Sequence, residues 1–148
     1  MASYITIAEG QAYMDNRLHV RAWDCTSADE QRRAITMATE IIDRLNYLGC
    51  KAVDTQVNQF PRLDDTVVPQ DVKNATSEVA LALLDGVDPE LEYENLQLRS
   101  QGMGSARSAF DKTPPPPHLV AGIPSVTAWR YLKPYLRDPN ELDIYRIG

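Results

Sequence analysis

The sequence feature that most constrains the fold is the run 79–84, which reads VALALL and is apolar at every position. It ends a longer segment in which apolar residues recur at helical spacing, namely Val72, Ala75, Val79, Ala80 and Leu83. A helix that is apolar all round must be covered all round. The sequence therefore predicts that this helix lies in the middle of a helical bundle.

The residues at the two ends of this segment predict where the helix begins and ends. Pro69 fits a helix start, because a first-turn N–H has no intrahelical partner that proline could remove. Gly86 fits a helix end, because glycine readily adopts the left-handed conformation found there. The corner at 60–62 and the turn at 64–65 precede the helix, and we expect them to set its angle of entry.

Two capping boxes predict two further helices nearer the N-terminus. In Thr6–Glu9 and in Ser27–Glu30, a hydroxyl residue stands three positions before a glutamate, so each side chain can bind the other's backbone N–H. The first box predicts a short helix to about residue 16. The second opens the longest predicted helix, over 27–48, whose apolar stripe is Ile35, Ala38, Ile41, Ile42, Leu45 and Leu48.

Residues 96–110 alternate weakly between polar and apolar side chains and carry Gly102 and Gly104 near their middle. Glycines at such a place are typical of a hairpin tip that needs positive φ. The sequence thus predicts a small β-hairpin. Together with a fourth helix over 124–136, the expected fold is mainly α, a bundle of about four helices with a small β-hairpin and an extended C-terminal arm.

The predicted arm begins with four consecutive prolines, Pro114–Pro117, which form a stiff polyproline II spacer. We therefore divide the chain into a helical domain with its hairpin, 1–112, and an arm, 113–148, made of the spacer, the short helix and a tail. The alternative is that this helix folds back onto its own bundle and that the tail frays. If the arm reaches a partner, the predicted partner-binding residues are Trp129, Leu132, Leu136, Ile144, Tyr145 and Ile147.

Composition limits the classes of function. The formal net charge of −6 argues against non-specific affinity for a polyanion. No apolar run approaches the ~20 residues that span a bilayer, and the first residues do not have the pattern of a signal peptide. Cys25 and Cys50 do not form a CxxC motif, so reduced cysteines in a cytosolic setting are expected.

Residues that could carry chemistry are isolated from one another in the sequence. His19 and His118 stand beside no Ser or Cys signature, so a structural or surface role is expected for both. Asp64–Asp65 fits a turn better than a cation site, because adjacent carboxylates need further ligands. The glycines at 102 and 104 lack the frame and the lysine of a phosphate loop. The sequence predicts no catalytic residue, no cofactor and no metal, and hence no enzyme.

A set of short motifs follows one another in a particular order along the chain. They are Tyr4-Ile5-Thr6, Ala8, Ala12, Tyr13, Trp23, the helix at 34–48, Phe60-Pro61-Arg62, Val68-Pro69, Val72, Lys73, Ala75, 78–84, Gly102, Ile123-Pro124, Leu132, Pro134, Tyr135 and Leu136. This order resembles a family of small tailed-phage proteins that is often described as DnaT-like single-stranded DNA-binding and is similar to head-completion or head–tail connector (adaptor) proteins. The chain departs from the family pattern at Phe60, where the family tends to have tryptophan, and in the proline spacer and tail.

The resemblance implies a structural virion protein. Copies of it would form a ring, usually twelvefold, below the portal protein, extend the DNA channel and receive the tail or the next connector protein. Packaged DNA would pass without specific binding, which an acidic wall suits because like charges repel phosphates. The implied localisation is the virion, at the head–tail interface, after synthesis in the host cytoplasm, and no membrane is involved. The alternative is a DnaT-like single-stranded DNA-binding protein.

Overall fold

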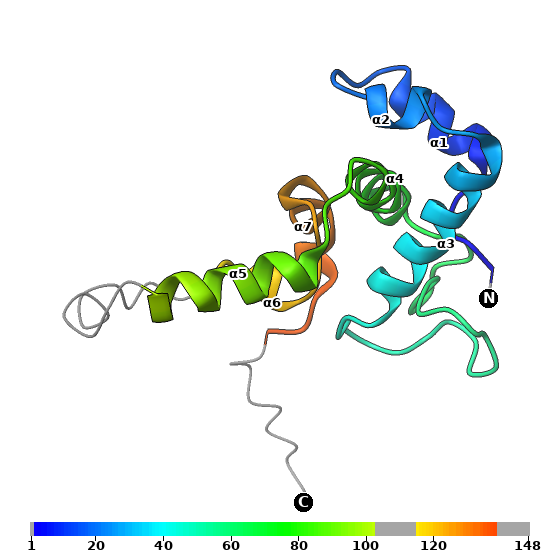
Figure 1. Ribbon diagram of the computed structural model, residues 1–148. Helices are drawn as coiled ribbons and strands as arrows, with labels where there is room; N and C mark the ends of the chain where they lie inside the picture. Colours follow the sequence, from blue (N-terminus) through cyan, green and yellow to red (C-terminus); the bar gives the residue numbers. More distant parts are fainter. Residues whose placement is uncertain (1, 103–114, 139–148) are drawn as a thin grey trace, which may run out of the picture.

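The computed structural model describes residues 2–102 and 115–138 (Figure 1). This part of the chain is mainly helical, as predicted, with seven α-helices, and its β-structure consists of isolated bridges. The helices and one 3-10 helix are α1 (Ile7–Met14), α2 (Arg21–Asp24), α3 (Ala28–Asp43), α4 (Gln70–Leu84), α5 (Pro89–Gly102), α6 (Pro117–Val120), α7 (Val126–Leu132) and η1 (Lys133–Tyr135). Within the described residues, no helix combines the length and the apolar character that crossing a membrane requires.

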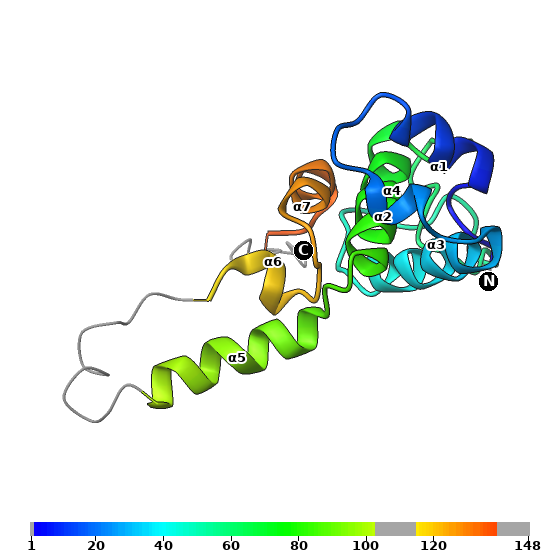
Figure 2. The ribbon, with the colours of Figure 1, turned by 45° about the horizontal axis from the view of Figure 1, so that its top comes forward.

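Helix α4 is the centre of the fold. It packs against α3 on one side and against α7 on the other, while α1 and α2 lie across it (Figures 1 and 2). All seven residues from 75 to 81 are buried. The fully covered stretch therefore lies about one turn earlier than 79–84, because Leu83 and Leu84 are only partly buried. The central position of this helix is confirmed.

The ends of α4 agree with the sequence prediction. Pro69 occupies the N-cap position, directly before the first helical residue. Gly86 has a φ of 87° and follows the C-cap residue. Its N–H donates to the carbonyl of Leu83, and the Val87 N–H donates to the carbonyl of Ala82, each at 3.1 Å. These two bonds form a Schellman motif, which satisfies carbonyls that the helix end leaves without partners.

Both predicted capping boxes are present. Thr6 and Glu9 exchange side-chain-to-backbone hydrogen bonds at the start of α1, and Ser27 and Glu30 do the same at the start of α3. Helix α3 nevertheless ends at Asp43, five residues before the predicted end. The Tyr47 hydroxyl donates to the carbonyl of Ile42 at 2.7 Å. This side chain therefore supplies a hydrogen bond to a carbonyl in the last turn of α3.

The predicted hairpin is not seen. Residues 96–102 belong to α5, and residues 103–110 lie outside the described part of the chain. Local signals explain the helix: the Asp88 carboxylate accepts from the N–H groups of Glu90 and Leu91, at 3.0 and 3.4 Å, and Pro89 stands at the first helical position. Gly102 is the last residue of α5. In Figures 1 and 2, α5 extends away from the body formed by α1 to α4.

The predicted arm is wrong for the residues that the structure describes. Pro116 and Pro117 begin α6, and α7 folds back onto α4. Leu132 is fully buried there, while Trp129 and Leu136 are partly buried against the same core. The carbonyl of Tyr135 accepts from the Leu48 N–H at 2.9 Å, which joins this segment to the connection that follows α3. The division at residue 112 falls among residues outside the described part, so it stays a prediction.

Candidate functional site

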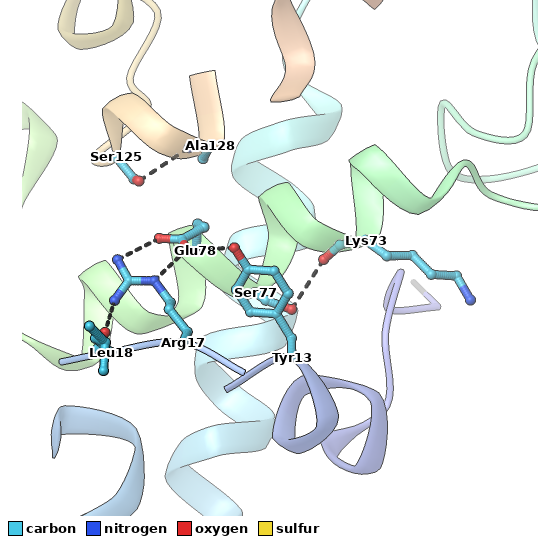
Figure 3. A network of polar contacts seen from close by, with 8 residues as sticks. All are labelled: Tyr13, Arg17, Leu18, Lys73, Ser77, Glu78, Ser125 and Ala128. Atoms are coloured by element: carbon cyan, nitrogen blue, oxygen red, sulfur yellow. Dashed lines mark hydrogen bonds and ion pairs between the residues drawn. The ribbon is translucent and has the colours of Figure 1, made fainter. Parts of the chain in front are cut away.

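A buried carboxylate lies at the centre of the molecule. The side chain of Glu78, on α4, is 3% exposed and meets the Arg17 side chain, which is 31% exposed. Arg17 Nε donates to Glu78 Oε1 at 2.5 Å and Nη2 donates to Oε2 at 3.1 Å, so the pair is bidentate. The Tyr13 hydroxyl donates to Glu78 Oε1 at 2.6 Å (Figure 3). Both carboxylate oxygens are thus occupied.

The two partners of Glu78, Tyr13 and Arg17, keep their protons in this network. Burial, and then the hydrogen bond to Glu78, raise the pKa of the Tyr13 hydroxyl, so this phenol stays protonated. The hydrogen bond to Glu78 raises the pKa of Arg17. A further guanidinium nitrogen, Nη1, donates to the carbonyl of Leu18 at 2.5 Å. The network joins the segment after α1 to the middle of α4 and acts as a structural clamp.

A shallow groove of about 310 Å³ lies beside this network, between α1 and α4. Its lining residues are Ile5, Glu9, Ala12, Tyr13, Gln70, Lys73, Asn74 and Ser77. Lys73 Nζ is 3.0 Å from Glu9 Oε1, and Gln70 donates to Asn74 Oδ1 at 3.0 Å. The backbone N–H of Thr6, followed by Lys73, lowers the pKa of the Glu9 carboxyl. Two pairs of polar side chains in the groove, Lys73 with Glu9 and Gln70 with Asn74, thus bind each other.

The corner at 60–62 is held in place by hydrogen bonds of its arginine side chain. Arg62 is 8% exposed, and its guanidinium donates to the carbonyls of Leu48 and Gly49 at 3.0 and 2.5 Å and to Gln59 Oε1 at 2.7 Å. The peptide bond before Pro61 is cis. Because these acceptors come from 48–49 and from residue 59, one buried cation joins two separate parts of the connection between α3 and α4.

Aromatic rings pack around the same corner. The Phe60 ring meets the rings of Tyr4, Tyr47 and Tyr135 edge-on, with centroids 6.0, 4.6 and 5.9 Å apart. The Tyr4 hydroxyl donates to Asp43 and accepts from the Phe60 N–H at 3.2 Å. Burial, and then the bond to Asp43, raise the pKa of Tyr4. A Phe at position 60 thus fills an aromatic cluster, where the resembled family tends to have the larger tryptophan.

The other residues weighed for chemistry lie apart. His19 is exposed before α2, and His118 is partly buried on α6, where burial lowers its pKa. Asp64–Asp65 is an exposed turn, and Cys25 and Cys50 are exposed, free thiols. Among residues 2–102 and 115–138, no group of three His, Cys, Asp or Glu residues could hold a metal ion.

The structure separates the predicted partner-binding residues. Leu132 is inside the core, and Trp129 and Leu136 cover it, so these three form no exposed patch. The other three, Ile144, Tyr145 and Ile147, lie outside the described residues, and their role stays a prediction. The Arg17–Glu78 clamp was not predicted. Its one sequence signal is a glutamate that directly precedes the run at 79–84.

Comparisons with known proteins bear on the whole arrangement. No curated protein and no solved structure matches the chain. A family model does match, over residues 1–101, about two-thirds of the sequence. The matched part includes α1 to α4, the clamp, the groove and the corner. The chain belongs to this family, which is described as "Putative DnaT-like ssDNA binding protein".

Proposed function

We propose that this chain is a structural subunit of a tailed-phage head–tail connector. Copies form a ring below the portal protein, extend the DNA channel and receive the tail or the next connector protein. The proposal starts from the order of motifs described above, which resembles connector proteins. It places the protein in the virion, after synthesis in the host cytoplasm.

The observation that carries the proposal is where the aromatic and buried polar groups lie. Every aromatic ring in the described part of the chain is buried or partly buried, and these rings are Tyr4, Tyr13, Trp23, Tyr47, Phe60, Tyr93, Trp129, Tyr131 and Tyr135. The buried charges of Glu78 and Arg62 bind groups of their own chain. A protein whose aromatic and buried charged groups face its own core is better suited to assembly with other proteins than to binding or converting a ligand. A net charge of −6 also suits a channel through which DNA slides.

Electron microscopy of the protein mixed with its portal protein tests this function. We expect a ring of added density on one face of the portal, with the contacts repeated around the axis. A portal that remains bare at high excess of this protein contradicts the connector function.

Single-stranded DNA binding is the second candidate, and the family match supports it more directly than it supports the connector. The family's own description names this activity. The sequence adds one favourable feature: residues 97–137 hold six Arg or Lys residues and a single Asp, although the chain as a whole is acidic. Against it stands the inward position of the described aromatic rings, because single-strand binders stack bases on exposed rings.

Fluorescence anisotropy with labelled oligonucleotides decides between the two candidates. Binding of single strands that is sub-micromolar and weakens steeply with salt identifies a DNA-binding protein. Full assembly on the portal without such binding identifies a connector.

A further inference from the structure

We propose that copies of this chain contact one another head to tail, through two surfaces of opposite charge. The first is the outer face of α7, formed by Val126, Arg130 and Lys133. The second is the connection surface, formed by Val53, Asp54, Val57, Leu63 and Asp64 between α3 and α4. This contact names the surfaces by which the proposed ring closes, so it rests on the proposed function.

The outer face of α7 is basic and partly apolar. Its residues follow one another at i, i+4 and i+7, opposite the buried Ala128 and Leu132. Val126 is 45% exposed, and Arg130 and Lys133 are exposed and form no ion pair with the described residues. The sequence from 113 to 137 contains no Asp or Glu, so nothing along this segment neutralises the two charges.

The connection surface has the opposite character. Val57, Leu63 and Val53 are 70, 60 and 57% exposed, so the long connection at 44–69 presents several apolar side chains to solvent. Asp54 and Asp64 are exposed beside them.

Two basic residues near these valines, Arg62 and Lys51, are less exposed than the carboxylates and bind acceptors within the connection. Arg62 is buried against backbone carbonyls, and Lys51 donates to the carbonyl of Gln56 at 3.2 Å. The exposed charges that remain beside the valines are therefore carboxylates.

The position of the two surfaces directs the contact to a second copy. Helix α7 packs on one side of α4, whereas α3 and the turn at 53–57 lie on the other, as Figure 1 shows. That turn lies apart from α7 within one chain, although the start of the same connection, at 46–48, pairs with residues 135–137 after α7. Opposite charges orient the encounter of two copies, and the valines on both surfaces supply apolar area to bury. Two different surfaces make a heterologous contact, which repeats from copy to copy and closes into a ring if the rotation allows.

Charge reversal on the full chain tests this contact. Sedimentation velocity at high protein concentration and low ionic strength measures self-association of the wild type, of Asp54→Arg and of Arg130→Asp. Each variant places a like charge opposite one residue of the contact and cancels the net charge of one surface, because Asp64 or Lys133 keeps its sign. We therefore expect its dissociation constant to rise about tenfold or more. Glu40→Arg and Arg33→Asp are matched controls, because they make the same charge changes at exposed positions of α3.

Mixing the two variants is the decisive measurement. The unchanged Arg130 of one variant then meets the unchanged Asp54 of the other, and the two reversed residues are also opposite in sign, so wild-type association returns. Four results overturn the contact: a wild type that stays monomeric under all these conditions, variants that associate like the wild type, controls that lose association equally, or a mixture that stays dissociated.

Two further results separate this contact from the functions proposed above. A ring that forms on the portal with either single variant keeps the connector function and overturns the contact. Self-association that follows the charge rule, with no binding to a portal, keeps the contact and overturns the connector. If Arg130→Asp abolishes binding to single-stranded DNA but leaves self-association unchanged, the face of α7 is a phosphate-binding surface and the contact is wrong.

Discussion

At the scale of single residues, the Arg17–Glu78 pair shows how a buried charge is tolerated. The bidentate contact and the Tyr13 hydroxyl replace the water that the carboxylate loses. Since the two charged residues are 61 positions apart, no short spacing in the sequence predicts the pair. A glutamate within a predicted core helix was a visible signal, but only the fold could identify its partner.

Removing one member of the pair should destabilise the protein more than removing both. Arg17→Met leaves an unpaired carboxylate on α4, and we expect a loss of about 3 kcal/mol, because Arg17 itself is partly exposed. Arg17→Met combined with Glu78→Gln leaves no charge behind and should recover part of that loss. Denaturant unfolding of the two variants, with Arg33→Met as an exposed control, measures the difference. A combined variant that is less stable than Arg17→Met contradicts the clamp.

Buried tyrosines should make the folded protein less stable at high pH. Burial raises the pKa of Tyr4, Tyr13 and Tyr47 well above the ordinary value of 10.0. The unfolded chain therefore releases these protons first, so the stabilisation is complete below pH 10 and is lost as the pH rises further. We expect absorbance at about 295 nm to show fewer than the seven tyrosines of the chain ionising before it unfolds. Ionisation of all seven in one reversible step, with the helical signal intact, contradicts this burial.

At the scale of elements, the sequence predicted what depends on neighbouring residues. Both capping boxes and both ends of α4 are local signals, and all four are present. The errors come from contacts distant in sequence. Tyr47 ends α3 early, and the core that α4 offers draws α7 back onto the body in spite of the prolines before it. The predicted hairpin is not seen, because the weak alternation at 96–102 lies within a helix that begins at Pro89 and continues to Gly102.

The burial pattern of α4 predicts that Val79→Ala destabilises the protein more than Leu83→Ala does. Side-chain size alone would predict the opposite order. Val79 is fully buried and Leu83 only partly. Val79→Ala should cost about 2 kcal/mol, from two lost methyl groups and the cavity that remains. Leu83→Ala should cost about 1 kcal/mol, because part of its surface already meets solvent. Midpoints of urea unfolding give both values, and a larger loss for Leu83→Ala would place the covered stretch at 79–84 after all.

The C-terminal segment should divide into a part that the fold needs and a part that it does not. Truncation after Asp138 removes none of the described core, so the melting temperature should stay within a few degrees. Leu132→Asp places a charge at a fully buried position and should unfold the protein or lower its melting temperature sharply. Calorimetry compares the two, with Lys133→Asp as the exposed control on the next residue. A large loss on truncation would show that the last ten residues belong to the core.

At the scale of the whole molecule, charge is divided unevenly along the chain. The matched family region contains 17 of the 21 acidic residues, whereas residues 97–137 are basic. Net charge alone therefore describes neither part. Within the described basic residues, phosphate binding and contact between copies both use the exposed Arg130 and Lys133, so the two proposals can be tested with the same variants.

The last prediction concerns single-stranded DNA. We expect no binding tighter than about 10 μM at physiological salt, because the acidic body repels phosphates and the described aromatic rings are turned inward. The measurement is anisotropy of labelled oligonucleotides, at low and at physiological salt, for the wild type and for Arg130→Asp with Lys133→Asp. Weak binding that appears only at low salt and is lost in the double variant fits residual electrostatic attraction to the face of α7. Sub-micromolar binding at physiological salt would make DNA binding the function, because attraction from two exposed cations could not supply that affinity against the charge of the body.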